Sequence, residues 1–156
     1  MSQIRLLNEE NVARAIFLPE MMEDGGVISY SAFTLRHNES YFSVARMAVD
    51  SWLEDIKRIP QNDTRILGGY CRMNVGTIRA IDFRNDGDTL TFDVEDKSSQ
   101  KNLSHAGIVV TFGGGQLRGD KHLVLKPIPA NISASRLLMR IQSRLAKIAS
   151  MDFVAL

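Results

Sequence analysis

The chain has 156 residues, of which 44% are hydrophobic and 24% are charged, and its formal net charge is +1. This length is sufficient for one globular domain with its own core, so we expect residues 1–156 to form a single domain. The near-neutral charge excludes the overall basic excess of a dedicated nucleic-acid-binding protein, so an electrostatic site would have to come from the distribution of charge.

Disulfide, metal and membrane chemistry are not indicated by the sequence. The single cysteine, Cys71, cannot form an intramolecular disulfide, and the three histidines, at positions 37, 105 and 122, do not have metal-ligand spacing. No signal-peptide pattern is present, and no window approaches the roughly 20 apolar residues of a membrane span. We therefore expect a cytoplasmic, bacterial-type protein without a metal, a cofactor or a membrane contact.

The first third of the chain predicts a helix and then a hairpin. Asn8 is a favourable N-cap, and the apolar residues after it have helical spacing, which predicts a short helix that ends before Pro19. Residues 27–35 and 41–47 are rich in aromatic and β-branched side chains and flank the polar segment HNES. This pattern predicts two strands joined by a hairpin loop.

A second helix is predicted between residues 47 and 56. Val49, Trp52 and Ile56 recur there at helical spacing, so Trp52 should be largely buried in the core. Ser51 and Glu54 would form a capping box if this helix starts late.

The clearest local signal is a hairpin in the middle of the chain. Residues 77–84 and 89–95 flank the sequence NDGD, whose central Asp-Gly pair suits a tight type I′ turn. Pairing outward from this turn places Phe83 opposite Leu90 and Ile81 opposite Phe92. All four side chains then share one face, so the turn and the burial pattern indicate the same register.

The last third predicts two more strands and a long helix. Residues 106–112 are almost wholly apolar, which predicts a central strand covered on both faces, and residues 121–126 alternate as its antiparallel partner would. Residues 133–150 follow two prolines and predict one long helix. Its core stripe consists of Ala134, Leu137, Leu138, Ile141, Leu145 and Ile148.

These elements together predict an α+β fold. We expect a largely antiparallel sheet of about five to seven strands with two or three helices, and the long C-terminal helix packed on one face of that sheet.

Basic side chains give the chain its strongest charge asymmetry, because no acidic residue occurs between Lys121 and Lys147. The C-terminal helix carries a basic ridge that consists of Arg136, Arg140, Arg144 and Lys147. Spacings of four, four and three residues make this ridge continuous over about 16 Å. Such a row can follow a phosphate backbone or an acidic protein surface, but an ordinary solvated helix face has the same composition.

Four further residues are candidates for chemistry. His105 precedes the apolar strand, where a partly desolvated imidazole can act as a general acid or base, although a histidine that only caps the strand fits as well. Arg36 and Glu39 lie at the tip of the predicted first hairpin, where they either pair in solvent or join His105 around a phosphate-bearing substrate. Arg79 would lie on the apolar face of the middle hairpin, either reaching solvent along its stem or pointing into a cleft.

Two functions follow from these candidates. The leading hypothesis is a small binding module, of the accessory, antitoxin or immunity type, that contacts a protein partner or nucleic acid through the basic ridge. The alternative is a small metal-independent enzyme acting on a phosphodiester or nucleotide, with His105 as acid/base, Arg36 stabilising charge and Glu39 orienting the histidine. A cleft that joins His105 to Arg36 or Arg79 would favour the enzyme.

Overall fold

The computed structural model describes residues 5–35, 39–85, 87–112, 115–118, 122–123 and 134–156. Its strands are β1 (Asn11–Leu18), β2 (Phe42–Arg46), β3 (Ile66–Asn74), β4 (Phe83–Asn85), β5 (Asp88–Asp96), β6 (His105–Phe112), β7 (Gly115–Arg118), β8 (His122–Leu123) and β9 (Phe153–Ala155). Its helices are α1 (Trp52–Lys57), α2 (Val75–Arg79), α3 (Ala134–Ala149) and the 3₁₀ turn η1 (Tyr30–Ala32).

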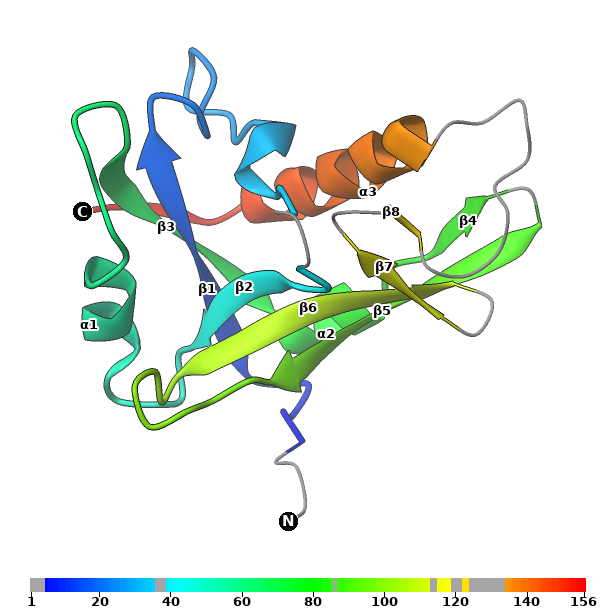
Figure 1. The fold of residues 1–156 in the computed structure, drawn as a ribbon, viewed down its shortest axis with the longest axis horizontal. Helices are drawn as coiled ribbons and strands as arrows, with labels where there is room; N and C mark the ends of the chain where they lie inside the picture. The colour runs from blue at the N-terminus through cyan, green and yellow to red at the C-terminus, as the bar shows by residue number, and fades with distance from the viewer. Residues whose placement is uncertain (1–4, 36–38, 86, 113–114, 119–121, 124–133) are drawn as a thin grey trace.

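The strands form one antiparallel sheet (Figure 1). Its main path has the order β4-β5-β6-β2-β1-β3-β9, and β7 pairs with β6 and with β8 beside this path. The predicted α+β class with a largely antiparallel sheet is therefore confirmed. The main path contains seven strands, and β7 and β8 bring the sheet to nine within the described residues.

The sheet opens between β1 and β2. These strands pair only at Val12 with Arg46 and at Ala13 with Ala45. Beyond Ala13, β1 continues along β3 as far as Leu18, whereas β2 runs alongside β6. The two halves of the sheet therefore diverge, as Figure 1 shows, and a cavity lined by residues of both strands lies at this opening.

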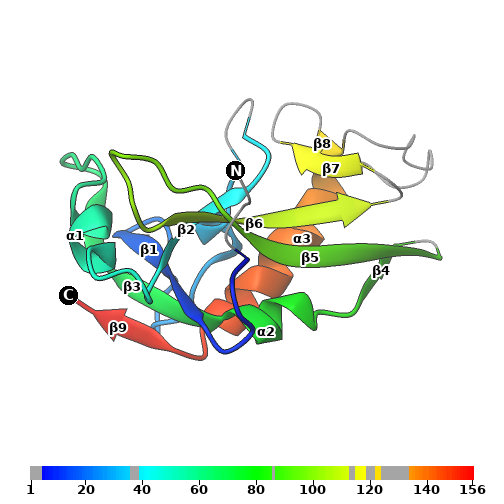
Figure 2. The same cartoon turned by 90° about the horizontal axis from the view of Figure 1, so that it is seen from below.

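Helix α3 covers one face of the sheet (Figures 1 and 2). Leu137, Ile141 and Leu145 are completely buried, which confirms the predicted apolar stripe of this helix. Gln142 is also buried, and its side-chain amide donates a 2.6 Å hydrogen bond to the carbonyl oxygen of Phe33. This bond ties α3 to the segment around η1. No helix in the described part of the chain is long and apolar enough to cross a membrane.

Several predicted elements are confirmed. Phe83 pairs with Leu90 in the β4–β5 hairpin, and Gly87 has a φ of 81°, as the Asp-Gly turn requires. Strand β6 is central, because it lies between β5 and β2. Helix α1 begins late, at Trp52, but the Ser51 hydroxyl donates to Asp55 instead of capping the helix.

The helix predicted after Asn8 is wrong, because residues Asn11–Leu18 form strand β1. Most of its side chains are buried on both faces of the sheet, so the burial pattern lacks the alternation typical of a half-exposed strand. An apolar run of this kind matches helical spacing by chance, and its pairing with β2 and β3 decides the outcome.

The first predicted hairpin is also wrong, although its second strand, predicted at residues 41–47, is confirmed as β2. Residues 27–35 form no strand: Ile28 makes one isolated bridge to Met22, and the turn η1 follows, with Ser29 as its N-cap. Strand β2 pairs instead with the distant strands β1 and β6. The aromatic and apolar residues of this segment therefore pack into the core without forming a strand, and Phe33 is completely buried.

Two further expectations need correction. Residues 75–79 form helix α2 instead of the first part of the predicted strand. The Asn74 side chain caps this helix by accepting a 2.9 Å hydrogen bond from the Thr77 N–H. The strand therefore starts only at Phe83, and Ile81 does not pair with Phe92. After its loop β6 pairs with β7, and the described residues of the predicted partner, His122 and Leu123, pair with β7 instead of β6; residues 121 and 124–126 of that prediction lie outside the described residues. Strand β3 was not predicted.

Candidate functional site

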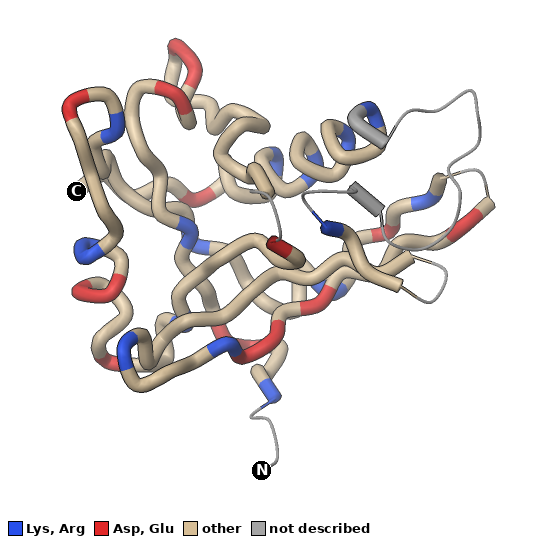
Figure 3. Tube along the Cα trace, in the orientation of Figure 1, with Lys and Arg blue, Asp and Glu red and all other residues tan. Residues whose placement is uncertain are grey.

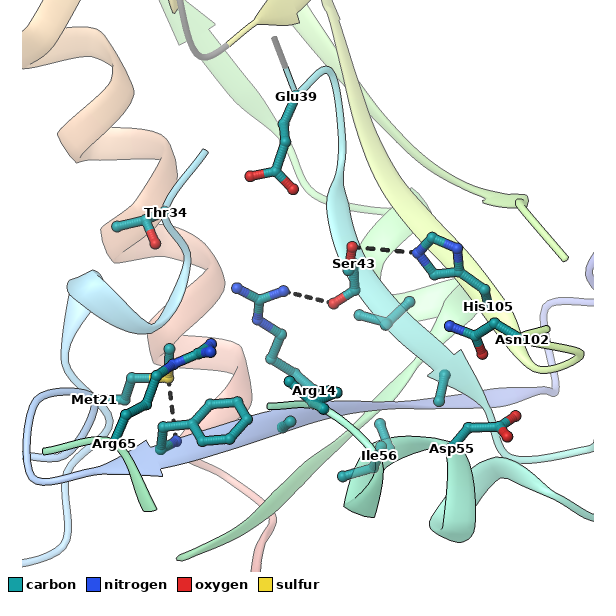
Figure 4. A pocket seen from close by; sticks show the side chains of 16 residues that line it. Arg14, Met21, Thr34, Glu39, Ser43, Asp55, Ile56, Arg65, Asn102 and His105 are labelled. Carbon is teal, nitrogen blue, oxygen red and sulfur yellow. Dashed lines mark hydrogen bonds between the residues drawn. The ribbon is translucent and has the colours of Figure 1, made fainter. Parts of the chain in front are cut away.

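A cavity of about 220 Å³ lies where β1 and β2 separate, and we call it the split cavity (Figure 4). Its apolar lining comes from small residues of β1 and β2, from Phe17, from Ile56 of α1 and from Ile59, which follows that helix. Its polar lining includes two guanidinium groups, a serine–histidine pair and two carboxylates, beside Thr34 and Asn102. The charged residues and the serine–histidine pair are Arg14, Arg65, Ser43, His105, Glu39 and Asp55.

Arg14 spans the opening of the sheet. Its Nη1 donates to the carbonyl oxygen of Ser43 on β2 at 2.6 Å, and its Nε and Nη2 donate to the carbonyl oxygen of Ala32 at 3.0 and 2.8 Å. The guanidinium carbon also lies 5.3 Å from the centre of the Phe33 ring. The contact with Ser43 gives one main-chain acceptor of β2 a partner beyond its pairing with β1, and the contacts together fix the guanidinium at the cavity.

Arg65 forms another wall of the split cavity. A register shift in β1 between Ile16 and Phe17 alters its pairing with β3 near this wall, and the Arg65 guanidinium lies 3.9 Å from the centre of the Phe17 ring. Its Nη1 also donates to the carbonyl oxygen of Pro60 at 3.4 Å. Within the described residues Arg65 forms no ion pair with a carboxylate.

Ser43 and His105 form a hydrogen-bonded pair across neighbouring strands. His105 pairs with Ala45 in the ladder, so its side chain shares a face of the sheet with that of Ser43, two residues earlier on β2. The Ser43 Oγ lies 3.2 Å from Nε2 of the imidazole. The Tyr41 ring packs against the histidine edge to face, and it crosses β6 over Gly107, where a Cβ would lie 2.5 Å from Tyr41.

The environment of His105 favours the neutral imidazole. Burial lowers the pKa of His105 below its ordinary value, and the nearby Lys97 ammonium acts in the same direction. A hydrogen bond between the ring and the backbone of Lys97, together with the Asp96 carboxylate, opposes this shift only in part. At neutral pH the ring is therefore predominantly unprotonated and can accept a proton.

Asp55 fixes the segment that precedes His105. Its Oδ2 accepts from the Ser104 hydroxyl at 2.5 Å, from the Ser104 N–H at 3.3 Å and from the Ser51 hydroxyl at 3.0 Å, and the carboxylate also pairs with Arg58. Burial opposes ionisation, but these hydrogen bonds and the Arg58 guanidinium outweigh it and lower the pKa of Asp55 below its ordinary value. Asp55 thus connects α1 to the start of β6.

The structure brings two of the three predicted catalytic residues to one cavity. Glu39 and His105 both line it, with the Glu39 carboxylate directed toward Arg14 and the imidazole directed toward Ser43 (Figure 4). Arg36 lies outside the described residues. Arg14, Arg65 and Ser43 were not predicted as site residues. Only Arg14 left a signal, because a charged residue within the apolar run NVARAIFL needs a buried partner or a site.

Arg79 lies away from the split cavity. It belongs to α2 and forms an ion pair with Asp93, with 2.6 Å between its Nε and the carboxylate oxygen. Its Nη1 also donates to the Leu6 carbonyl oxygen and the Asn8 side chain, both at 2.8 Å. These contacts tie the N-terminal segment to β5, which is a structural role. A ligand-binding role of Arg79 stays a prediction.

The basic ridge lies along α3, where Figure 3 shows several basic positions. Its central residues contact β4 and the segment before it: the Arg140 guanidinium lies 4.9 Å from the centre of the Phe83 ring, and Arg144 donates to the Asp82 carbonyl oxygen at 2.7 Å. Arg136 and Lys147, near the two ends of the ridge, are exposed. Recognition of a protein or nucleic acid by this ridge stays a prediction.

Two other chemistries can be assessed from the described residues. No group of three or more His, Cys, Asp or Glu side chains in that part of the chain is arranged to hold a metal ion. Cys71 is completely buried, and burial raises the pKa of its thiol to about 12, so the reactive thiolate is not formed at neutral pH.

Comparison of the chain with protein-family models, with curated protein sequences and with solved structures finds no match.

Proposed function

We propose that the protein binds a small molecule carrying a phosphate or carboxylate group in the split cavity. The observation that carries this proposal is Arg65, which lies on the Phe17 ring at the cavity wall and has no carboxylate partner within the described residues. A guanidinium that stacks on an aromatic face presents its N–H donors at the edge of the plane. This geometry suits the oxygens of phosphate and carboxylate groups.

Arg14 supports the same assignment. It places a second guanidinium at this cavity and is fixed by three hydrogen bonds to main-chain carbonyl oxygens. Because the side chain is already ordered, little rotamer entropy is lost when an anion binds.

The size of the cavity indicates the size of the ligand. A volume of about 220 Å³ is below the roughly 300–1,000 Å³ of pockets for drug-sized ligands. The ligand is therefore a small metabolite, or it inserts only its anionic end. Phe17, Ile56 and Ile59 offer apolar contact to the carbon skeleton that carries the anion.

A titration tests the proposal. Inorganic phosphate, glycerol phosphate, a sugar phosphate and a short carboxylic acid are added at constant ionic strength to ¹⁵N-labelled protein, and amide and arginine Nε–H shifts are recorded. We expect saturable shifts at the cavity, and a stabilisation of about 2.7 kcal/mol when the ligand reaches a hundred times its dissociation constant. Arg65→Gln should weaken binding by about tenfold or more, because it removes a charge-assisted hydrogen bond.

Arg84→Gln is the matched control, because Arg84 is an exposed arginine of β4 outside the cavity lining. This variant should bind as the wild type does. Shifts that do not saturate with any of the four compounds, or equal weakening in both variants, would contradict the proposal.

A further inference from the structure

The serine–histidine pair gives the split cavity a reactive group. The Ser43 Oγ and the His105 Nε2 are 3.2 Å apart, within the range of a hydrogen bond between a nucleophile and its base. Both residues line the cavity that contains Arg14 and Arg65. A ligand bound by these guanidinium groups therefore lies in the same cavity as a hydroxyl and a base.

The imidazole is suited to act as a base. Burial lowers the pKa of His105, so at neutral pH one of its ring nitrogens is unprotonated. When that nitrogen is Nε2, it can receive the Ser43 proton across the 3.2 Å hydrogen bond.

The position of Arg14 favours phosphoryl transfer over other reactions of a serine. Its Nη1 contacts the carbonyl oxygen of Ser43 itself, so the guanidinium lies beside the residue that would attack. Catalysis of phosphoryl transfer consists largely of positioning and of stabilising negative charge on the transferred oxygens, and arginine supplies both.

We infer that Ser43 is the nucleophile and His105 the general base of a phosphomonoester hydrolase, an activity that rests on the proposed binding of an anion in this cavity. In the first step a bond forms between Ser43 Oγ and phosphorus as the bond from phosphorus to the leaving oxygen breaks. The Oγ proton passes to His105 Nε2 and from there to the leaving alkoxide.

In the second step His105 takes a proton from water, and the hydroxide attacks the phosphoserine. The bond between phosphorus and Oγ breaks, and His105 returns the proton to Oγ. One water is consumed, an alcohol and inorganic phosphate are released, and nothing is oxidised or reduced. Both residues touch the reacting atoms, so both are catalytic residues in this assignment.

The test uses the full chain with p-nitrophenyl phosphate and a panel of small phosphomonoesters. We expect turnover by the wild type, a loss of at least about a hundredfold in kcat for Ser43→Ala and for His105→Asn, and an unchanged rate for Ser143→Ala, an exposed serine of α3. Acid-quenched wild type should also carry one phosphoryl group on Ser43, detected by peptide mass spectrometry, and Ser43→Ala should carry none.

The phosphate titration separates this inference from the proposed function. Ser43→Ala should still bind inorganic phosphate, because Arg14 and Arg65 remain. If the wild type binds phosphate but does not turn over any of the esters, or if Ser43→Ala retains the wild-type rate, the inference is overturned and the binding function stands. If no variant binds phosphate, both fail.

Discussion

Replacement of Asp55 by alanine should lower the free energy of unfolding by about 3–5 kcal/mol, the range typical when one partner of a buried charged network is removed. The Asp55 side chain is 3% exposed, and Ser104, from which it accepts two hydrogen bonds, is completely buried. Truncation leaves the Ser104 hydroxyl and N–H without their acceptor, at about 1–3 kcal/mol each. The loss of the Arg58 pair adds less than about 1 kcal/mol, because the Arg58 side chain is 61% exposed.

Urea unfolding at neutral pH, followed by circular dichroism, measures this effect as a lower midpoint with an unchanged slope. For a chain of this size each kcal/mol lowers the melting temperature by about 2–4 °C, so thermal unfolding should show a decrease of roughly 6–20 °C. Asp55→Asn should lie between wild type and Asp55→Ala, because the amide keeps one acceptor oxygen.

Glu54→Ala is the matched control, since Glu54 is the exposed neighbour of Asp55 on the same helix. It should change stability by less than about 0.5 kcal/mol. If Asp55→Ala and Glu54→Ala have the same urea midpoint, the carboxylate does not hold α1 to the start of β6.

Three further outcomes are expected. Trp52→Ala should lower the free energy of unfolding, measured with urea, by about 3 kcal/mol, the lower end of the range for a tryptophan. The reason is that Trp52 is only partly buried and packs against Tyr70, with 4.9 Å between the ring centres. An unchanged urea midpoint would show that this contact is not stabilising. Because burial lowers the pKa of His105 in the folded protein, the unfolded chain takes up this proton first on acidification. The contribution of His105 to the free energy of unfolding should therefore be fully present above pH 6.5, the ordinary pKa of histidine, and should be lost as the pH decreases below that value. The loss should be smaller in His105→Asn. Replacement of Arg140 and Arg144 by Glu should abolish capture of a protein or nucleic-acid partner by the basic ridge. For nucleic acid, the slope of the logarithm of the binding constant against the logarithm of the salt concentration should also decrease by about one unit per lost phosphate contact. If the folded double variant keeps the wild-type binding and slope, the ridge is only a solvated helix face.

The sequence by itself determines the elements that depend on neighbouring residues. The β4–β5 register follows from the Asp-Gly turn, which fixes Phe83 opposite Leu90 before any distant contact forms. Helix α3 follows from an apolar stripe, of which Leu137 and Ile141 are completely buried. Strand β6 follows from an apolar run with no polar face. In each case the spacing of side chains along a short segment carries the information.

Only the tertiary structure decides which strands pair and what lies between them. Strand β1 has the local pattern of a helix, but its partners are β2 and β3, and its pairing with them overrides that pattern. The split cavity arises because β1 and β2 separate after two residue pairs. Arg14, Ser43, Arg65 and His105 reach it from four separate segments of the chain. No local spacing relates these residues, because the choice of partner strands depends on the packing of the whole core.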